Sequence, residues 1–235
     1  MSIKAILFDL DGTLLPMDQP LFVRTYFKRL TEKMVSYGYN PDDFISALKS
    51  GIYAMINNNG EQTNADVFWR AFAQIIGDKV YEDMTLFDQF YEQNFDDIKT
   101  VCGYDAKAAD IIATVKSKGL RSCLATNPIF PSIATEKRVL WAGLNVDDFE
   151  FLTTYENSCF AKPNPEYYSR IAQRLGLYPD ECVMVGNDTS DDLAAEKIGM
   201  KTFILTDCLI NRENIDVSNY NNGNMSTLIE YINNL

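Results

Sequence analysis

Short apolar runs that end abruptly in polar residues recur along the chain. Such runs are typical of strands in a parallel sheet covered on both faces, because neither face of the strand meets water. We predict strands at residues 4–8, 120–125, 149–152, 182–185 and 202–205. An asparagine-rich stretch, residues 219–224, is interpreted as a loop that precedes a last helix.

Helical patterns with clear ends separate these runs. Residues 105–118 place their apolar side chains on one stripe, and Gly119 follows as a left-handed cap. Asn164 and Pro165 suit the N-cap and first turn of another helix, which we expect to end at Gly176. The alternation of strands and helices predicts an α/β fold with a doubly wound parallel sheet.

The region between the first two predicted strands differs, because helical periodicity continues there without a strand pattern. Four apolar stripes follow one another: Val23, Phe27, Leu30, Met34 and Tyr37; Ile45, Leu48, Ile52 and Met55; Val67, Phe68, Ala71, Phe72 and Ile75; Phe87, Tyr91, Phe95 and Ile98. The third stripe begins with a capping box, Thr63 to Asp66. Amphipathic helices bury such stripes against each other or against the sheet. We therefore predict an inserted α-helical bundle over residues 16–99 and a core domain formed by residues 1–15 and 100–235.

Composition and charge limit the classes of molecule that the protein is expected to bind. The chain has 235 residues, and 46% of them are hydrophobic, which is enough for a sizeable core. Its 21 basic and 33 acidic residues give a net charge of -12, which repels polyanions and acidic membrane surfaces. We expect no nucleic-acid partner and no membrane partner. A small anionic molecule can still bind, because a metal ion and one lysine reverse the potential inside a pocket.

The same composition indicates the compartment. No apolar stretch approaches the roughly 20 residues that a membrane-spanning helix needs, and the first residues lack the pattern of a secretory signal. Five cysteines are scattered without a Cys-x-x-Cys pair, which suits reduced thiols. These features predict a cytoplasmic protein, which we expect to be a monomer or a homodimer.

The absence of histidine excludes several kinds of catalysis. Ser-His-Asp and Cys-His systems, His-Glu-x-x-His zinc sites and phosphohistidine chemistry all need an imidazole. No cysteine is followed six residues later by an arginine, as a cysteine phosphatase would require, and no glycine-rich phosphate loop is present. Acid-base and nucleophilic catalysis, if present, must therefore use aspartate, glutamate, lysine or tyrosine side chains.

Polar residues follow the predicted strands where ligands bind in open parallel sheets, beyond the carboxyl ends of the strands. The residues at three of these ends are Asp9 and Asp11, Thr126 and Asn127, and Asn187 and Asp188. Lys162 lies just ahead of a helix N-terminus, which itself favours anions. Together these residues predict one polar site at the edge of the sheet.

These residues resemble the motifs of the haloacid dehalogenase superfamily in its phosphatase form. The first motif is similar to Phe-Asp-Leu-Asp-Gly-Thr-Leu at residues 8–14, and the second to Thr126. Lys162 with the proline after it resembles the third motif, and Gly-Asn-Asp-Thr-Ser-Asp-Asp at residues 186–192 the fourth. The motifs occur in the family's order. The resemblance implies a Rossmann-like core, with the helical insertion in the position of the family's class-one cap.

The resemblance also implies catalytic and metal-binding roles. Asp9 would attack the phosphorus atom and form a phospho-aspartyl intermediate. Asp11 would protonate the leaving alcohol and then deprotonate the hydrolytic water. The cofactor would be Mg²⁺, held by the side chain of Asp9, the backbone carbonyl of Asp11 and the side chain of Asp188. Members of the superfamily that dehalogenate carbon substrates lack the second aspartate, so Asp11 favours phosphoryl transfer.

Binding of the phosphoryl group is assigned in the same way. Lys162 would neutralise both the phosphate and Asp9, and would thus belong to the catalytic set as well as the binding set. The hydroxyl of Thr126 and the amide of Asn127 would donate hydrogen bonds to the phosphoryl oxygens. Basic residues of the insertion could reach a second anionic group of a substrate; they are Arg24, Lys28, Arg29 and Arg70.

The fourth motif leaves the metal ligand open. Counting back from Gly199 places Asn187 at the family's usual ligand position, whereas the Asp-x-x-x-Asp spacing places Asp188 and Asp192 there. We favour Asp188, because an amide would neutralise no charge. Asp191 or Asp192 would then support it from outside.

The sequence thus predicts a hydrolase that acts on a small phosphorylated metabolite, a phosphomonoester. The alternatives are a sugar phosphomutase with the same aspartate chemistry, a haloacid dehalogenase, and a binding module without turnover. A requirement for a bisphosphate would indicate the mutase, and halide release without magnesium the dehalogenase.

Overall fold

Residues 2–235 are described by a computed structural model in which a single parallel sheet forms the centre of the fold. The strands are β1 (Ala5–Phe8), β2 (Arg121–Leu124), β3 (Cys182–Gly186), β4 (Lys201–Leu205) and β5 (Asn221–Gly223). Their order is β2-β1-β3-β4-β5, so β1 pairs with β2 on one side and with β3 on the other. Strand order therefore reverses next to β1, which is where a ligand site is expected.

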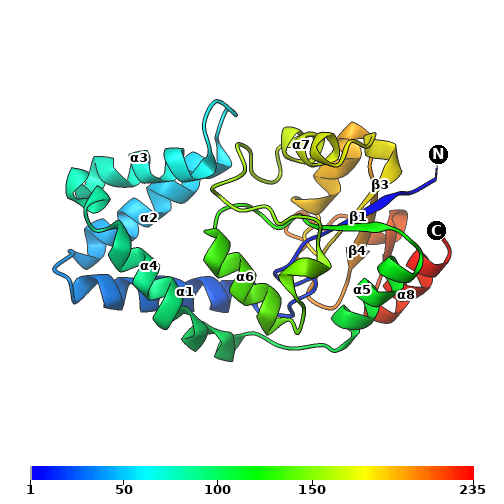
Figure 1. Cartoon of the computed structure of the whole chain (residues 1–235), viewed down its shortest axis with the longest axis horizontal. Coiled ribbons are helices and arrows are strands. Elements are labelled where there is room, and N and C mark those ends of the chain that lie inside the picture. Colours follow the sequence, from blue (N-terminus) through cyan, green and yellow to red (C-terminus); the bar gives the residue numbers. More distant parts are fainter. Residues whose placement is uncertain (1) are drawn as a thin grey trace.

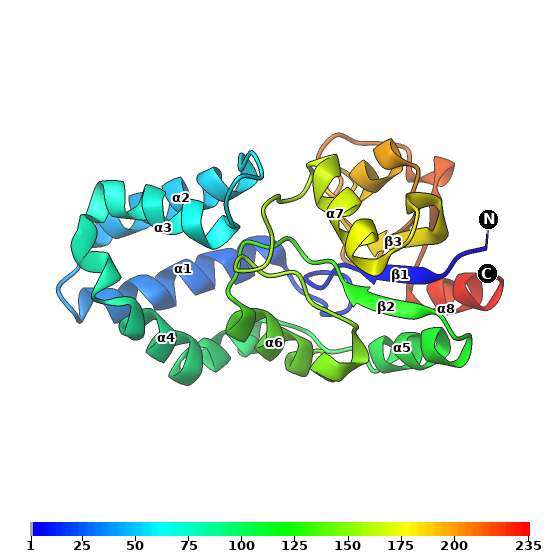
Figure 2. The same ribbon diagram turned by 45° about the horizontal axis from the view of Figure 1, so that its top comes forward.

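Helices cover both faces of this sheet. They are α5 (Lys107–Ser117), α7 (Pro165–Leu175) and α8 (Met225–Asn233), whereas α6 (Ser132–Trp141) packs against the helical segments between residues 84 and 101. Figure 2 shows α7 on one side of the strands and α5 with α8 on the other. The alternating side chains of β1 follow this division, because Ile6 and Phe8 pack in the core with α5 and α8, and Leu7 packs with α7. The prediction of a doubly wound α/β fold is confirmed.

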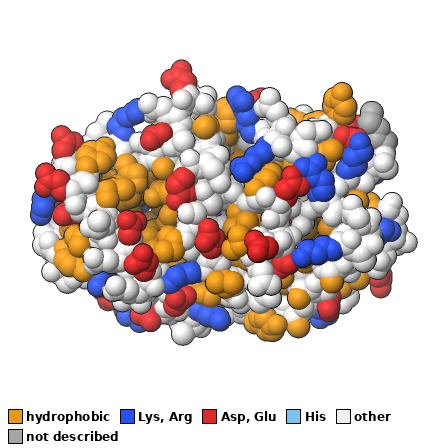
Figure 3. Space-filling model, viewed as in Figure 1, with side chains coloured by type: hydrophobic (Ala, Val, Ile, Leu, Met, Phe, Trp, Pro, Cys, Tyr) orange, Lys and Arg blue, Asp and Glu red, His pale blue; other side chains and the backbone are white. Residues whose placement is uncertain are grey.

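Four further helices lie between β1 and β2 in the sequence and away from the sheet in space (Figure 1). They are α1 (Gln19–Val35), α2 (Pro41–Ile56), α3 (Asn64–Ile76) and α4 (Met84–Gln93). The capping box at Thr63 is formed as expected, with Asp66 bonding back to the Thr63 backbone. On the face shown in Figure 3, apolar side chains gather over this helical part of the chain.

One strand prediction and one loop prediction differ from the structure. Residues 149–152 lie along β2 and bond Ser122 and Leu124 through the backbone, but they form one isolated bridge, between Leu152 and Leu124, and no full strand. A 3-10 turn (Val146–Asp148) precedes this segment and a turn at residues 155–157 follows it. Residues 221–223 were expected to be a loop but form β5, which pairs with β4 through the backbone. An edge strand of this kind needs no apolar side chains, so its composition gave no strand signal.

Only the second half of the stripe predicted on α1 is confirmed. Leu30 and Met34 are buried as expected, but in the first half Phe22 and Tyr26 are buried and Val23 is 40% exposed. Tyr37 lies beyond the end of the helix. Apolar residues occupy both sets of positions, so periodicity alone could not separate them. The predicted ends of the other helices are confirmed, since α7 begins after the N-cap Asn164 and ends at a left-handed Gly176. Within residues 2–235, every helix is too short or too polar to cross a membrane.

Candidate active site

Asp9 follows directly after β1 and is held from both sides. Its backbone N–H donates to the carbonyl of Val185 on β3 at 2.8 Å, and its Oδ2 accepts from the hydroxyl of Thr13 at 3.2 Å. The turn between these two residues passes through Gly12, whose φ is 84° and where a Cβ atom would collide with the side chain of Asn187. Glycine therefore allows the chain to fold back tightly, and only 7% of Asp9 is exposed.

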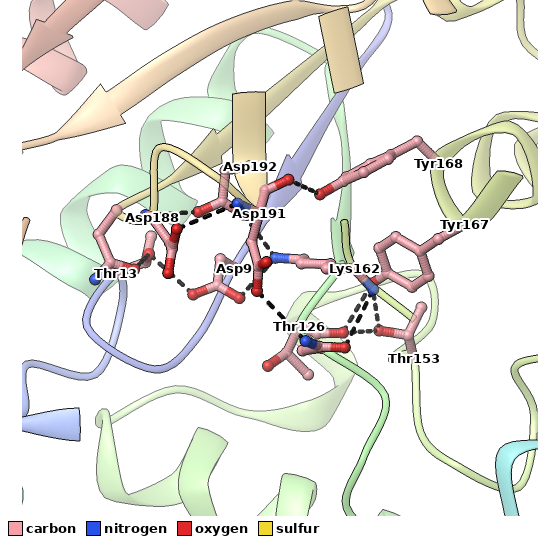
Figure 4. Close-up of polar contacts among 12 residues, drawn as sticks. Asp9, Thr13, Thr126, Thr153, Lys162, Tyr167, Tyr168, Asp188, Asp191 and Asp192 are labelled. Carbon is pink, nitrogen blue, oxygen red and sulfur yellow. Dashed lines mark hydrogen bonds and ion pairs between the residues drawn. The ribbon is translucent and has the colours of Figure 1, made fainter. Parts of the chain in front are cut away.

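Lys162 points between two carboxylates (Figure 4). Its Nζ lies 2.8 Å from Oδ1 of Asp9 and 2.7 Å from Oδ1 of Asp192, and only 2% of the residue is exposed. Burial alone would lower the pKa of Lys162, but the charges of Asp192 and Asp9 outweigh it and hold this pKa well above its ordinary value. The lysine is therefore a permanent cation next to Asp9. Burial raises the pKa of Asp9, and Lys162 opposes that effect.

The loop after β3 carries the residues of the fourth motif, and most of their polar atoms are engaged. Asn187 donates to the carbonyl of Cys208 at 2.7 Å and accepts from Thr13 at 3.0 Å. Asp192 bonds Lys162 with one oxygen and accepts the backbone N–H of Asp188 at 2.9 Å with the other. This carboxylate packs against Gly186, where a Cβ atom would collide with it. Asn187 and Asp192 thus stabilise the conformation of the loop.

Asp188 and Asp191 are the carboxylates of this loop with capacity left for a ligand. Asp188 accepts the N–H groups of Ser190 and Asp191 with Oδ1 and pairs with Arg212 at 2.7 Å through Oδ2. The side chain of Arg212 is 61% exposed, so this pair is open to exchange. Oδ2 of Asp191 lies 3.4 Å from the amide of Asn127. Burial raises the pKa of Asp191 to about 6, with Lys162 opposing and the charge of Asp188 adding to the rise.

The loop after β2 is held by the backbone of Thr126 and by the side chain of Asn127. The carbonyl of Thr126 accepts from Thr153 at 2.7 Å and from Tyr167 at 2.8 Å. Asn127 accepts the backbone N–H of Lys162 at 3.2 Å. Thr153 and Tyr167 were not predicted from the sequence, and their residue types gave no signal for this role.

Asp11 has a partner that the sequence did not reveal, because Arg138 on α6 bonds its Oδ2. Arg138 is fully buried, and its guanidinium carbon lies 4.3 Å from the centre of the Phe130 ring. The second oxygen of Asp11, Oδ1, is buried and has no hydrogen-bond partner within residues 2–235. A signal existed in the sequence, since Arg138 lies on the same helical stripe as the buried Ala134 and Trp141.

One pocket collects all the strand-end residues named from the sequence. Its wall includes Asp9, Asp11, Thr126, Asn127, Lys162, Asn187, Asp188, Asp191 and Asp192. The four basic residues of the insertion do not line it. Arg24, Lys28 and Arg29 are exposed, and Arg70 is exposed and bonds Gln62.

The charge balance of this wall suits a divalent cation. Five aspartates line the pocket; within residues 2–235 they are balanced by Lys162 in the wall and by Arg138 and Arg212, which pair with Asp11 and Asp188, so negative charge is still in excess. Within that part of the chain, no three acidic or cysteine side chains converge on a metal position by themselves. Mg²⁺ does not need such a cage, because it keeps several waters and takes one or two carboxylates. Hard oxygen donors with surplus negative charge therefore fit Mg²⁺.

The fold and the pocket together define an α/β core with an acidic pocket at the carboxyl end of its first strand. The chain belongs to the haloacid dehalogenase-like hydrolase family, whose sequence model matches residues 3–199. The predictions of this family, of its fold class and of an enzyme are thereby confirmed.

Curated relatives agree with the phosphatase type. Pyrophosphatase PpaX of Bacillus cereus (strain AH820) is 24% identical over 203 residues, which cover 86% of this chain and 82% of the relative. Phosphoglycolate phosphatase of Pectobacterium atrosepticum is 23% identical over 206 residues, which cover 87% of this chain and 81% of the relative.

Solved structures show the same fold. A HAD phosphatase from Thermococcus onnurineus has a TM-score of 0.59 at 21% identity, with 98% of each chain covered. The L-2-haloacid dehalogenase RSc1362 also has a TM-score of 0.59, at 18% identity, with 99% of this chain and 100% of that chain covered. Since a phosphatase and a dehalogenase are equally similar in fold, the reaction must be inferred from the site.

Proposed function

We propose that this protein is a Mg²⁺-dependent phosphatase that hydrolyses small phosphomonoesters through a phospho-aspartyl intermediate on Asp9. The observation that carries the proposal is the buried contact of 2.8 Å between Nζ of Lys162 and Oδ1 of Asp9. A carboxylate that attacks a phosphate meets about 4 kcal/mol of repulsion per pair of unit charges at 4 Å in an effective dielectric of 20. A buried lysine beside the nucleophile offsets that repulsion.

Asp9 is the nucleophile in this proposal. One of its oxygens forms a bond to phosphorus while the bond from phosphorus to the ester oxygen breaks. Lys162 and Thr13 hold the carboxylate in one orientation. When bound by Asp9, Asp188 and the backbone carbonyl of Asp11, Mg²⁺ would neutralise the charge of the phosphate.

Asp11 moves the protons. It gives a proton to the leaving alkoxide in the first step, and takes a proton from the water that attacks the intermediate in the second. The unbonded Oδ1 supports this role, because a buried acceptor without a partner gains most from a substrate or water that donates to it. Arg138 holds the other oxygen and thus positions the side chain.

Thr126 and Asn127 bind the phosphoryl oxygens through their hydroxyl and amide groups. Both residues line the pocket next to Lys162, and the backbone of their loop is held by Thr153 and Tyr167. Donors that are fixed before the substrate arrives stabilise the charge of the transition state without reorganising.

The alternatives have less support. A phosphomutase must hold a second phosphate; in the described part of the chain Lys162 is the one cation of the pocket wall, and Arg138 and Arg212 beside it are paired with Asp11 and Asp188. A dehalogenase has no use for the second aspartate, Asp11.

A cytoplasmic location and a monomeric or dimeric state stay predictions from the sequence. The division into a core of residues 1–15 and 100–235 and a cap of residues 16–99 also stays a prediction.

Phosphate release from p-nitrophenyl phosphate tests the proposal. We expect turnover with Mg²⁺, none with EDTA, and none in Asp9→Asn, whose circular dichroism should match that of the wild type. Asp180→Asn is the matched control, because Asp180 lies outside the pocket in the 3-10 turn Pro179–Glu181. Undiminished turnover in Asp9→Asn would refute the assignment.

A further inference from the structure

An apolar cavity lies among the helices of the insertion, next to the catalytic pocket. It has a volume of about 180 Å³ and is walled by side chains of α1, α2, α3 and α4, by residues 129–131 and by Tyr155. An apolar cavity of roughly 150 Å³ is enough to bind benzene. This one therefore has room for a ring or a short branched chain. Figure 3 shows the apolar side chains that gather over the same helices.

The cavity and the catalytic pocket share part of their walls. Val23, Ile129 and Phe130 line both of them. Phe130 also packs against Tyr26 of the cavity, with ring centres 5.1 Å apart. An ester whose phosphoryl group lies at Asp9 therefore has this cavity beside its alcohol part.

The cavity offers no cation to a substrate. Of the side chains that residues 2–235 place in its wall, only Asp88 is charged. In the catalytic pocket the cation is Lys162, which is already engaged by Asp9 and Asp192. Arg138 and Arg212 adjoin the catalytic pocket, but they are paired with Asp11 and Asp188. A second anionic group on a substrate would thus meet no unpaired cation in either wall as residues 2–235 form it.

The tyrosines of the wall add polarity but no charge. The hydroxyls of Tyr26 and Tyr91 are 2.7 Å apart and bond each other. Burial raises the pKa of both, and it raises the pKa of Tyr155 to about 12. All three are neutral near pH 7 and leave few hydrogen bonds for a guest, so the cavity suits an uncharged group.

We propose that the substrates are phosphate monoesters of uncharged, mainly hydrophobic alcohols, such as branched-alkyl or benzyl phosphates, whose apolar part lies in this cavity. The inference rests on the phosphatase function proposed above and names its substrate class. It excludes esters with a second anionic group as preferred substrates, although the curated relatives include a pyrophosphatase and a phosphoglycolate phosphatase.

A panel of four esters tests the substrate class by kcat/KM in Mg²⁺. Isopentyl phosphate should exceed propyl phosphate by about 100-fold, since each further carbon in an apolar pocket is worth about tenfold or more. Benzyl phosphate should also exceed propyl phosphate. Phosphoglycolate, which is close to propyl phosphate in size but carries a carboxylate, should be the poorest of the four.

A pair of valine variants on α1 tests the location. Val23 lines the cavity and is 40% exposed, and Val35 lies outside it and is 41% exposed. Val23→Lys should lower kcat/KM for isopentyl phosphate by about tenfold or more and raise that for phosphoglycolate, because it places a cation in an apolar wall. Val35→Lys should change neither by more than about twofold. Equal behaviour of the two variants would contradict the location.

A binding measurement reports on the cavity without turnover. Trp69 lies in its wall, so benzyl alcohol should change the tryptophan fluorescence of the wild type but not of Trp69→Phe, which keeps Trp141. Absence of any change in the wild type would overturn the cavity as the binding site.

The failures of the two proposals are distinguishable. Turnover of phosphoglycolate at or above that of isopentyl phosphate would overturn the substrate class and leave the phosphatase function standing. Absence of turnover for every ester, p-nitrophenyl phosphate included, would overturn the phosphatase function and with it the substrate class.

Discussion

The guanidinium of Arg138 bonds the carboxylate of Asp11, although 127 positions separate the two residues. Arg138 is 0% exposed, and a charge in such a place requires a partner because removal from water is costly. The pair ties α6 to the loop that also carries Asp9. It engages one oxygen of Asp11 and leaves the other, Oδ1, unbonded in the active site.

Replacement of this arginine should therefore be costly. Arg138→Met is expected to lower the free energy of unfolding by about 3–5 kcal/mol, because it leaves a largely buried carboxylate without its partner. The double variant with Asp11→Leu should recover part of that loss. Urea unfolding of the two single variants and the double variant measures the coupling.

A surface pair provides the comparison. Lys116 and Asp148 are 2.6 Å apart, but Lys116 is half exposed. Lys116→Met should therefore cost no more than about 1 kcal/mol. Arg138→Met should also slow phosphate release and alter its pH profile, since the position of Asp11 is lost. A variant with the stability and pH profile of the wild type would show that Arg138 does not position Asp11.

Lys162 should control how stability depends on pH. Without it, Asp9 and Asp192 would face each other as buried like charges, and their pKa values in the folded state would rise further. The folded state of Lys162→Met would then bind more protons than the unfolded state, so its stability should fall as pH rises. In EDTA, we expect a loss of about 3 kcal/mol or more at neutral pH and a smaller loss near pH 5. Unfolding curves of wild type and variant that differ by the same amount at both pH values would contradict this.

The ends of the strands were predictable because a parallel sheet brings them to one edge. Asp9 and Asp188 follow buried apolar runs, and β1 and β3 are neighbours in the sheet. Lys162 was predictable from its place ahead of the helix that begins at Pro165. The ends of the apolar runs were thus enough to predict that Asp9 and Asp188 lie in one site.

Other features depend on tertiary pairing that a single chain does not encode locally. Arg138 is one basic residue among several on the surface helices, and only its buried stripe distinguishes it. On α1, Phe22 and Val23 are both apolar, so packing against the rest of the protein decided which one faces the core. Arg24 and Arg70, considered as substrate contacts from charge alone, are exposed.

Arg212 should compete with the metal ion. Its guanidinium lies 2.7 Å from Oδ2 of Asp188, the carboxylate favoured as a Mg²⁺ ligand. Arg212→Gln is expected to tighten Mg²⁺ binding several-fold, on the order of 1 kcal/mol, because it removes a positive charge from the ligand. Calorimetric titration with Mg²⁺ measures the change. Arg170→Gln is the control, since Arg170 lies on α7 outside the pocket; weaker Mg²⁺ binding in Arg212→Gln would contradict the competition.

Asp191 should destabilise the metal-free protein above pH 6. Burial raises its pKa from 3.8 to about 6, so the folded state holds this proton more tightly than the unfolded state. Its contribution to stability should therefore fall as pH rises from about 4 to about 6, and stay low above that. Asp191→Asn removes the effect.

The test is the stability of Asp191→Asn relative to wild type at two pH values in EDTA. Between about pH 4 and pH 7, the variant should gain on the order of 1–2 kcal/mol relative to wild type, after allowance for solvent screening of a partly exposed group. Mg²⁺ should reduce this gain, because a cation near Asp188 stabilises the charged form of Asp191. Comparison with the wild type cancels the titration of the other carboxyl groups. A difference between variant and wild type that is independent of both pH and Mg²⁺ would show that Asp191 does not face the metal site.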